Sequence, residues 1–400
     1  MDKPLHFHDT LPHDIITDIF SRLPVKSLIR FESLSKFWSN LFKTPEFISK
    51  HFQDWTHNNP SLILHHRQLD DIASDMPSLV YLLETEMTEL VKVHIPTTNN
   101  FNSWLHIVGS SNGLLCLNQF LGLNYTAIRI GYGTRQQVRR LPAEVNSGFI
   151  SSDYTILTGF GFSSQIDDYR VVRIYAGDDD SDHSGYSDSD QIPLDPVVLV
   201  EMYSLRSDSW KEINHSNLEF WDYEINSVTV NGRMFWIMSV SSMDHSDMIL
   251  SFDLGEETFM KIVIHQGLYI SSGWYYMELV SYKNLLGVMV YQDFEIEGRI
   301  FDLLVMKDNP HGGECWTKVF TVGPFLFIER PIAIWNDDIV FKIGLDDYGD
   351  KCCMCLFNPR TKEQKHFPTD EDHFSFQVYN YAESLVLLGA NGETDTEEAH

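Results

Sequence analysis

The chain has 400 residues, of which 43% are hydrophobic and 13% are aromatic, so it can bury a sizeable core and does not have a disordered composition. It carries 29 Lys and Arg residues against 57 Asp and Glu residues, a formal net charge of −28. Such an acidic surface repels phosphate backbones and anionic lipid, which argues against nucleic acid and membrane surfaces as partners.

The N-terminus lacks the apolar core of a secretion signal, and no apolar run reaches the roughly 18 residues that a membrane helix needs. The five cysteines are odd in number and unevenly spaced, which fits a reducing compartment. We therefore expect a cytoplasmic or nuclear protein without a membrane segment.

Residues 11 to about 52 have the periodicity of short amphipathic helices. Pro24 and Pro45 break the pattern, which predicts two or three helices. The apolar positions include Ile15, Ile19 and Leu23 before the first break, and Leu28, Phe31, Leu34, Trp38 and Leu41 after it. About forty residues cannot bury this much apolar surface among themselves, so the surplus indicates a partner.

After about residue 60 the pattern changes to short β-branched and aromatic runs separated by turn residues. Asn-Gly between alternating apolar runs is a strong hairpin signal. Hairpin turns are predicted at Asn112-Gly113, Asp167-Asp168, Asn231-Gly232, Lys283-Asn284 and Asn336-Asp337. A second signature, a strand with a large or apolar residue after a polar bend, centres on Leu90, Val138, Trp210, Phe259, Trp316 and Gln364.

These centres recur at intervals of 48, 72, 49, 57 and 48 residues, and the long interval contains an acidic insert, residues 176–196. Without the insert, four strands recur about every fifty residues, the size of a kelch-like propeller blade. The strand region 79–95 and the last predicted hairpin, 376–388, would complete one blade and close the ring. The pattern predicts a mainly β protein with a small N-terminal helical domain and a six-bladed, propeller-like C-terminal domain; a β-sandwich is the alternative.

Residues 11 to 51 resemble the F-box of plant proteins. The matching positions are Leu11, Pro12, Asp14, Ile15, Ile19, Arg22, Leu23, Pro24, Val25, Lys26, Ser27, Leu28, Arg30, Phe31, Ser35, Lys36, Trp38, Leu41, Pro45, Phe47 and His51. The rest resembles the plant F-box-associated domain, for example in SNGLLCL (111–117) and VNGRMFWI (230–237). The implied division is an F-box domain at 1–55, a propeller-like domain at 56–392 and a tail at 393–400.

The resemblance implies a non-catalytic substrate receptor of an SCF-type ubiquitin ligase, with no cofactor and no metal. The F-box would bind a Skp-type adaptor and, through it, a cullin. The adaptor-binding residues would be Leu11, Pro12, Ile15, Ile19, Leu23, Pro24, Leu28 and Phe31, with Asp14, Arg22, Lys26 and Arg30 as a charged rim. Loops of the propeller would bind an unknown protein substrate, and the net charge is compatible with a basic one.

Three readings remain open within and beyond this class. Some relatives are S-locus F-box proteins that recognise basic ribonucleases, and others act in defence or stress signalling. A propeller that binds a ligand or glycan, or acts as an enzyme, with a vestigial F-box is the alternative from another class. A cluster of His, Asp, Glu or Trp at the central mouth of the propeller would favour it.

Several conspicuous residues are better explained by packing than by chemistry. Trp210, Trp236 and Trp316 at equivalent positions of the repeat are expected to be core anchors. In a strand, Cys352 and Cys355 would point to opposite faces, so the CCMC run predicts buried strand cysteines rather than a zinc site. The acidic insert is expected to be a solvated loop. The functional alternatives are an electrostatic contact for a basic substrate or phosphorylation at Ser187 and Ser189.

Overall fold

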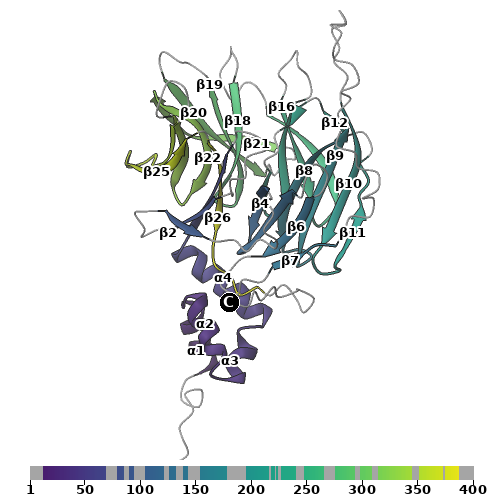
Figure 1. The fold of residues 1–400 in the computed structure, drawn as a ribbon, viewed down its shortest axis with the longest axis vertical. Coiled ribbons are helices and arrows are strands. Elements are labelled where there is room, and N and C mark those ends of the chain that lie inside the picture. Colours follow the sequence, from purple (N-terminus) through teal and green to yellow (C-terminus); the bar gives the residue numbers. More distant parts are fainter. Residues whose placement is uncertain are drawn as a thin grey trace, which may run out of the picture.

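The computed structural model describes most of the chain in segments. They are residues 12–68, 79–84, 90–93, 104–120, 126–131, 138–142, 154–177, 195–215, 218–220, 222–223, 227–239, 247–264, 275–292, 298–308, 314–344, 351–372 and 374–386. Four helices form a small unit at one end of the molecule, and strands form the large remainder (Figure 1). Leu11, the main part of the acidic insert (178–194) and the tail lie outside the described residues.

The helical unit comprises α1 (His13–Ser21), α2 (Val25–Glu32), α3 (Lys36–Leu41) and α4 (Pro45–Asn58). Pro24 separates α1 from α2, as the sequence predicted. Pro45 lies between α3 and α4 and occupies the first turn of α4, where the missing N–H of a proline costs little. The hydroxyl of Thr44 caps α4 by accepting a hydrogen bond from the backbone N–H of Phe47.

The strands form six antiparallel sheets, five of which take their strands in chain order. The first sheet consists of β4 (Trp104–Ser111), β5 (Leu114–Phe120), β6 (Thr126–Gly131) and β7 (Val138–Arg140), and the second of β8 (Tyr154–Ser163), β9 (Asp168–Gly177), β10 (Asp195–Ser204) and β11 (Ser209–Glu212), with β12 (Glu219–Phe220) beside β10. In the third sheet, β13 (Asp222–Tyr223) and β14 (Val228–Val230) both pair with β15 (Arg233–Ser239), which is followed by β16 (Asp247–Asp253) and β17 (Thr258–Val263). The fourth sheet consists of β18 (Tyr275–Tyr282), β19 (Leu285–Gln292), β20 (Arg299–Asp308) and β21 (Glu314–Phe325), and the fifth of β22 (Ile328–Trp335), β23 (Asp338–Gly344), β24 (Lys351–Phe357) and β25 (Gln364–Asp372).

The sixth sheet joins the two ends of the strand region in the order β26 (Phe374–Tyr381), β1 (Ser61–Gln68), β2 (Leu79–Glu84) and β3 (Val91–Val93). Closure between the early and late strands is therefore confirmed. The composition of the sheet differs from the prediction, because only one late strand takes part and residues 382–386 form no hairpin with it. The unpredicted member is β1, whose residues 61–65 are all buried and therefore lack polar alternation.

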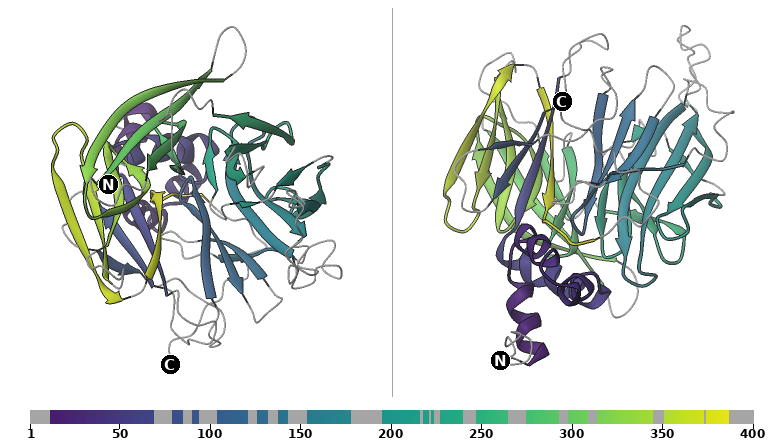
Figure 2. Two further views of the ribbon diagram at one scale, coloured as in Figure 1. Left: turned by 90° about the horizontal axis from the view of Figure 1, so that it is seen from above. Right: turned by 60° about the horizontal axis from the view of Figure 1, so that its bottom comes forward.

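Each sheet touches its two neighbours through one strand. The contacts run from β4 to β8, to β14, to β18, to β22, to β26 and back to β4. The sheets are thereby arranged around a central axis, as the view from above shows (Figure 2). This closed ring is a β-propeller, and it excludes the β-sandwich alternative.

Four of the five predicted hairpin turns are confirmed at their positions. Asn112-Gly113, Asn231-Gly232, Lys283-Asn284 and Asn336-Asp337 each join two paired strands. The fifth was misplaced, because Ser163 pairs with Asp168 and the turn consists of the four residues between them. Asp167 ends that turn with a φ of 51°, whereas Asp168 already belongs to β9.

The second signature marks the outermost strand of each sheet. Val138, Trp210, Phe259, Trp316 and Gln364 lie in β7, β11, β17, β21 and β25, and Leu90 directly precedes β3. The tryptophans predicted as core anchors are buried, with Trp236 fully so. Cys353 and Cys355 are buried in one core cluster, as expected for strand cysteines on the same face.

Candidate adaptor-binding surface

The helical unit presents large apolar side chains to solvent on α1, on α3 and in the connection between α2 and α3. Ile15 and Ile19 lie one turn apart on α1, and each is 48% exposed. Leu34, in the connection after α2, is 74% exposed, and Phe37 on α3 is 43% exposed. Exposed Ile, Leu and Phe side chains on so small a unit are the mark of an interaction surface.

The structure divides the predicted adaptor-binding residues into three groups. Pro12, Ile15, Ile19 and Pro24 are exposed, whereas Leu23 and Phe31 are half-buried against the helical core. Leu28 is completely buried, so its side chain is not available to a partner, and its assignment to the surface was wrong. The predicted rim residues Asp14, Arg22, Lys26 and Arg30 are all exposed.

Sequence reasoning did not assign Leu34 and Phe37 to the surface. Leu34 was counted within a continuous apolar stripe, because helical periodicity was extended through the connection between α2 and α3. The chain leaves the helix at Ser33, so Leu34 no longer points to the core side. The N-cap Ser35, whose hydroxyl accepts from the backbone N–H of Phe37, was the available signal of this break.

Polar contacts hold α1 against α4. The Ser21 hydroxyl donates to the Asp54 carboxylate at 2.7 Å, and Lys50 lies 3.0 Å from the same carboxylate. These hydrogen bonds, from Ser21 first and then Lys50, lower the pKa of Asp54. Lys50 also approaches Asp18 on α1 at 3.6 Å, so one ammonium group joins the two helices.

His51 on α4 contacts the connection between α1 and α2 and holds it in place. Its ring is buried between those of Phe47 and Trp55, and Nε2 lies 2.9 Å from the Leu23 carbonyl oxygen. Burial lowers the pKa of His51, and the hydrogen bond to Leu23 opposes the shift without reversing it. The neutral ring donates from Nε2 and holds Leu23 and Pro24 in place beside the exposed surface.

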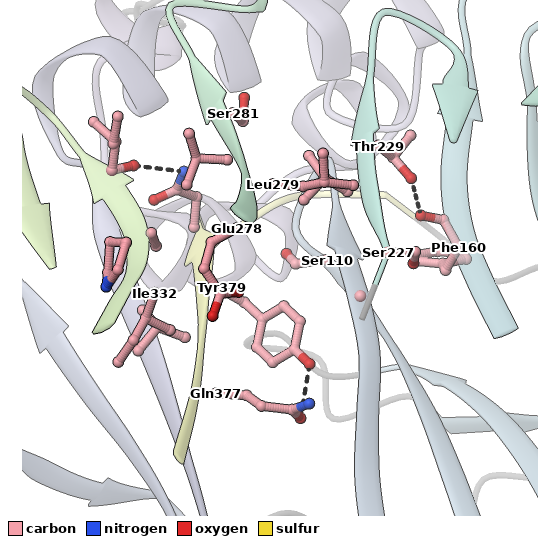
Figure 3. Close-up of a pocket in the computed structure, with 18 of the residues that line it drawn as sticks. Ser110, Phe160, Ser227, Thr229, Glu278, Leu279, Ser281, Ile332, Gln377 and Tyr379 are labelled. Atoms are coloured by element: carbon pink, nitrogen blue, oxygen red, sulfur yellow. Dashed lines mark hydrogen bonds between the residues drawn. The ribbon is translucent and has the colours of Figure 1, made fainter. Parts of the chain in front are cut away.

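The propeller has a pocket on its axis, lined by one strand from each of the six sheets: β4, β8, β14, β18, β22 and β26 (Figure 3). Its volume is about 200 Å³. The guanidinium of Arg330 lies 3.3 Å from the carboxylate of Glu278, and the hydroxyl of Tyr379 lies 3.0 Å from Oε1 of Gln377. Burial raises the pKa of Glu278, although Arg330 opposes the shift.

The lining of this pocket does not match the cluster expected for a ligand-binding or catalytic propeller. Among the described residues that line the pocket, Glu278 is the one carboxylate and Arg330 the one cationic side chain, and the two form an ion pair. These lining residues include no His and no Trp. In the described part of the chain, no group of three or more His, Cys, Asp or Glu side chains is placed to hold a metal ion.

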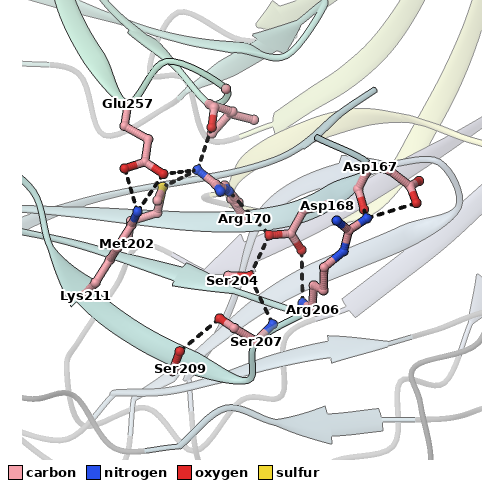
Figure 4. Close-up of polar contacts among 12 residues, drawn as sticks. Asp167, Asp168, Arg170, Met202, Ser204, Arg206, Ser207, Ser209, Lys211 and Glu257 are labelled. Carbon is pink, nitrogen blue, oxygen red and sulfur yellow. Dashed lines mark hydrogen bonds and ion pairs between the residues drawn. The ribbon is translucent and has the colours of Figure 1, made fainter. Parts of the chain in front are cut away.

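A polar network at the ends of β9, β10 and β11 joins the second sheet to the third (Figure 4). The Arg170 guanidinium donates to the Leu254 carbonyl oxygen at 2.6 Å and to the Glu257 carboxylate at 2.7 Å. Lys211 also reaches Glu257, at 2.6 Å. The cationic side chains of this network are already paired with acidic side chains. The network therefore links the two sheets and does not form an anion-binding site.

We expect Glu257→Gln to weaken the acid-side pH dependence of stability. Burial would raise the pKa of Glu257, but hydrogen bonds from Lys211 and Arg170 outweigh it, so the folded-state pKa lies below the ordinary 4.5. The wild-type carboxylate therefore stabilises the fold above pH 4.5, and this contribution is lost as the pH falls through the folded-state pKa.

The variant should lose about 1–3 kcal/mol of unfolding free energy at pH 7 and less on further acidification. Urea unfolding at several pH values between 3 and 7 measures the loss of unfolding free energy at pH 7 and its decrease at lower pH. Glu256→Gln, the same change at the neighbouring exposed position, is the control. Equal pH profiles for wild type and Glu257→Gln would contradict the assignment.

The helical unit followed by a ring of antiparallel sheets defines a class: an F-box joined to a β-propeller. Residues 9–50 match the F-box domain, and residues 76–388 match the F-box associated beta propeller domain. The chain therefore belongs to the family of F-box proteins with an F-box-associated propeller. Proteins of this family are non-catalytic components of SCF complexes, and the F-box implies binding of a Skp adaptor.

Three relatives from Arabidopsis thaliana illustrate the similarity. F-box protein CPR1 is 27% identical over 78% of this chain and 73% of its own length. F-box protein At3g07870 is 27% identical over 82% and 78%, and F-box/LRR-repeat/kelch-repeat protein At2g27520 is 28% identical over 84% and 85%. Among solved structures, the β-propeller domain of the Trilobed protease from Pyrococcus furiosus matches 68% of this chain and 72% of its own, with a TM-score of 0.38 and 10% identity.

None of the helices in the described residues has the length and apolar character that crossing a membrane requires.

Proposed function

We propose that this protein is the substrate-recognition subunit of an SCF-type ubiquitin ligase, acting in the cytoplasm or nucleus. Its F-box would bind the Skp-type adaptor and thereby a cullin, while the propeller would hold the protein to be ubiquitinated. The observation that carries the proposal is the pair Ile15 and Ile19, both 48% exposed on the first helix of a matched F-box.

The adaptor-binding surface would consist of exposed apolar residues surrounded by charges. We infer that it includes Pro12, Ile15, Ile19, Pro24, Leu34 and Phe37, with Leu11 before them and the half-buried Leu23 and Phe31 at the edge. Asp14, Arg22, Lys26 and Arg30 would form the rim. Such an arrangement, an apolar centre with a polar periphery, is typical of stable protein interfaces.

The substrate would bind at the face of the propeller that is opposite the helices. We infer that each of the six sheets is one blade, so that the connection from each fourth strand to the next first strand lies at that face. Leu326 and Phe327, between β21 and β22, are 68% and 73% exposed there. The net charge of −28 favours a basic substrate. This charge suits an S-locus role, in which the target is a basic ribonuclease, and is equally compatible with a receptor in defence or stress signalling.

The double variant Ile15→Ala/Ile19→Ala tests adaptor binding. We expect the dissociation constant for a purified Skp-type adaptor to rise by about 30-fold or more, because truncating a central interface residue costs about 2 kcal/mol or more. Biolayer interferometry on the full chain measures this change.

Ile300→Ala is the matched control, since Ile300 is 42% exposed on β20 of the propeller. It should bind the adaptor as the wild type does. If the wild type does not bind the adaptor, or if the double variant binds it equally well, the proposed function is wrong.

A further inference from the structure

The last described residues, 382–386, lie between the F-box helices and the propeller. They follow β26, which runs towards the helices (Figure 1). Ala382, Ser384 and Leu385 are buried, with exposures of 2%, 7% and 1%. Their burial shows that this segment belongs to the packed interior, although it forms neither helix nor strand.

On the helical side, Leu385 belongs to the F-box core. Its side chain shares one cluster with Val25 and Leu28 of α2, with Phe42, and with Phe47 of α4. Leu385 is separated from these residues by more than 330 positions of sequence, yet it is as deeply buried as they are. A fully buried Leu side chain is one of the larger individual contributions to a core as small as this one.

On the propeller side, the same segment is packed against the first hairpin turn. A Cβ atom on Gly113 would come within 2.3 Å of Ser384 Cβ and 2.5 Å of the Ala382 carbonyl oxygen, so only glycine permits this approach. Val386 packs against the buried cluster that contains Leu114 and Trp210. Adjacent residues of the segment therefore contact the two domains.

The covalent connection between the domains lies beside this segment. The α4 helix ends at Asn58, and β1 begins at Ser61, which pairs with Tyr381 at the end of β26. The linker before β1 and residues 382–386 after β26 thus lie next to each other at the ends of two paired strands, where the helices and the propeller meet. Burial raises the pKa of Glu383, while the positive charge of Lys26 on α2 opposes the shift.

We propose that residues 382–386 are a structural part of the F-box unit, which complete its core and hold it in one orientation against the propeller. The consequence is that correct packing of the adaptor-binding helices depends on residues at the far end of the propeller domain. Only this consequence for adaptor affinity rests on the proposed function. The packing itself is independent of it.

Hydrogen exchange on the full chain tests the proposal without the adaptor. In Leu385→Ala, we expect the amides of α2 and α4 to exchange about tenfold faster or more, because a cavity in their core lowers the free energy of local opening. The amides of β19 and β20, which are remote from the segment, should exchange at the wild-type rate. Leu326→Ala, the same substitution at a side chain that is 68% exposed, should change none of these rates.

A second measurement addresses the orientation. Spin labels at Ser49→Cys on α4 and Lys261→Cys on β17, both at exposed positions, report the distance between the domains in a Cys315→Ser/Cys352→Ser background. We expect a single narrow distribution for the wild type and a broadened one for Leu385→Ala. If Leu385→Ala does not fold, Leu385→Val takes its place, with smaller changes in the same two helices.

Unchanged exchange in α2 and α4, or a distance distribution that stays narrow in the Leu385 variant, would overturn the proposal. Adaptor affinity then separates the two hypotheses. A wild-type chain that fails to bind a Skp-type adaptor refutes the proposed function, whereas the exchange and distance results decide the role of residues 382–386 in either case.

Discussion

Phe341→Ala is expected to lower the free energy of unfolding by about 3–5 kcal/mol, the range for truncating a buried Phe. Phe341 in β23 is fully buried, and its ring centroid lies 5.0 Å from that of Phe301 in the preceding sheet and 5.7 Å from that of Phe325. The ring therefore fills the interface between the fourth and fifth sheets. Because small domains are stabilised by only about 5–15 kcal/mol in total, this loss is severe.

Phe327→Ala is the matched control, because the same ring is removed from a position that is 73% exposed. Its effect should stay within about 0.5 kcal/mol. Urea denaturation of the full chain, followed by tryptophan fluorescence, compares the two variants. Similar midpoints for both would mean that Phe341 is not a part of the core between the sheets.

Leu28→Ala should destabilise the F-box helices by about 2–5 kcal/mol, since Leu28 is fully buried and the variant leaves a cavity. The prediction follows from the position of Leu28 among Val25, Phe42 and Phe47. Limited proteolysis of the full chain should show faster cleavage within residues 12–58, with the propeller intact.

Ile19→Ala removes a similar side chain from the same helical unit, but from an exposed position. It should leave the proteolysis rate near that of the wild type and weaken adaptor binding directly. If Leu28→Ala is as resistant to proteolysis as Ile19→Ala, then Leu28 does not have the core role that its burial indicates.

Local signals in the sequence were reliable where the backbone itself demands a residue type. Asn112 and Gly113 have φ values of 46° and 79°, and Asn231 and Gly232 have 49° and 75°. Few other residues adopt these angles without strain, so the turns could be located from the sequence. The period of the second signature then predicted repeated four-stranded sheets, and the ring in the structure has this organisation.

Local sequence patterns failed to identify a strand that is buried on both faces, and they did not separate buried from exposed apolar positions on the helices. In β1, Leu62 and Leu64 face one core cluster and Ile63 faces another, so the strand has no polar face from which to recognise it. Leu28 and Ile19 are equally apolar and equally periodic, yet one is buried and the other is exposed. Periodicity identifies an apolar face but does not say whether the chain itself or a partner covers it.

The sequence by itself determined the family, the two-part organisation and most of the turns, because these depend on residue types at short, regular spacings. Only the tertiary structure decided which apolar residues of the helical unit are exposed and that Leu385 lies in the F-box core. The physical reason is that burial is a property of the whole folded chain. Residues 385 and 28 are neighbours because β26 pairs with β1, the strand that directly follows the F-box helices.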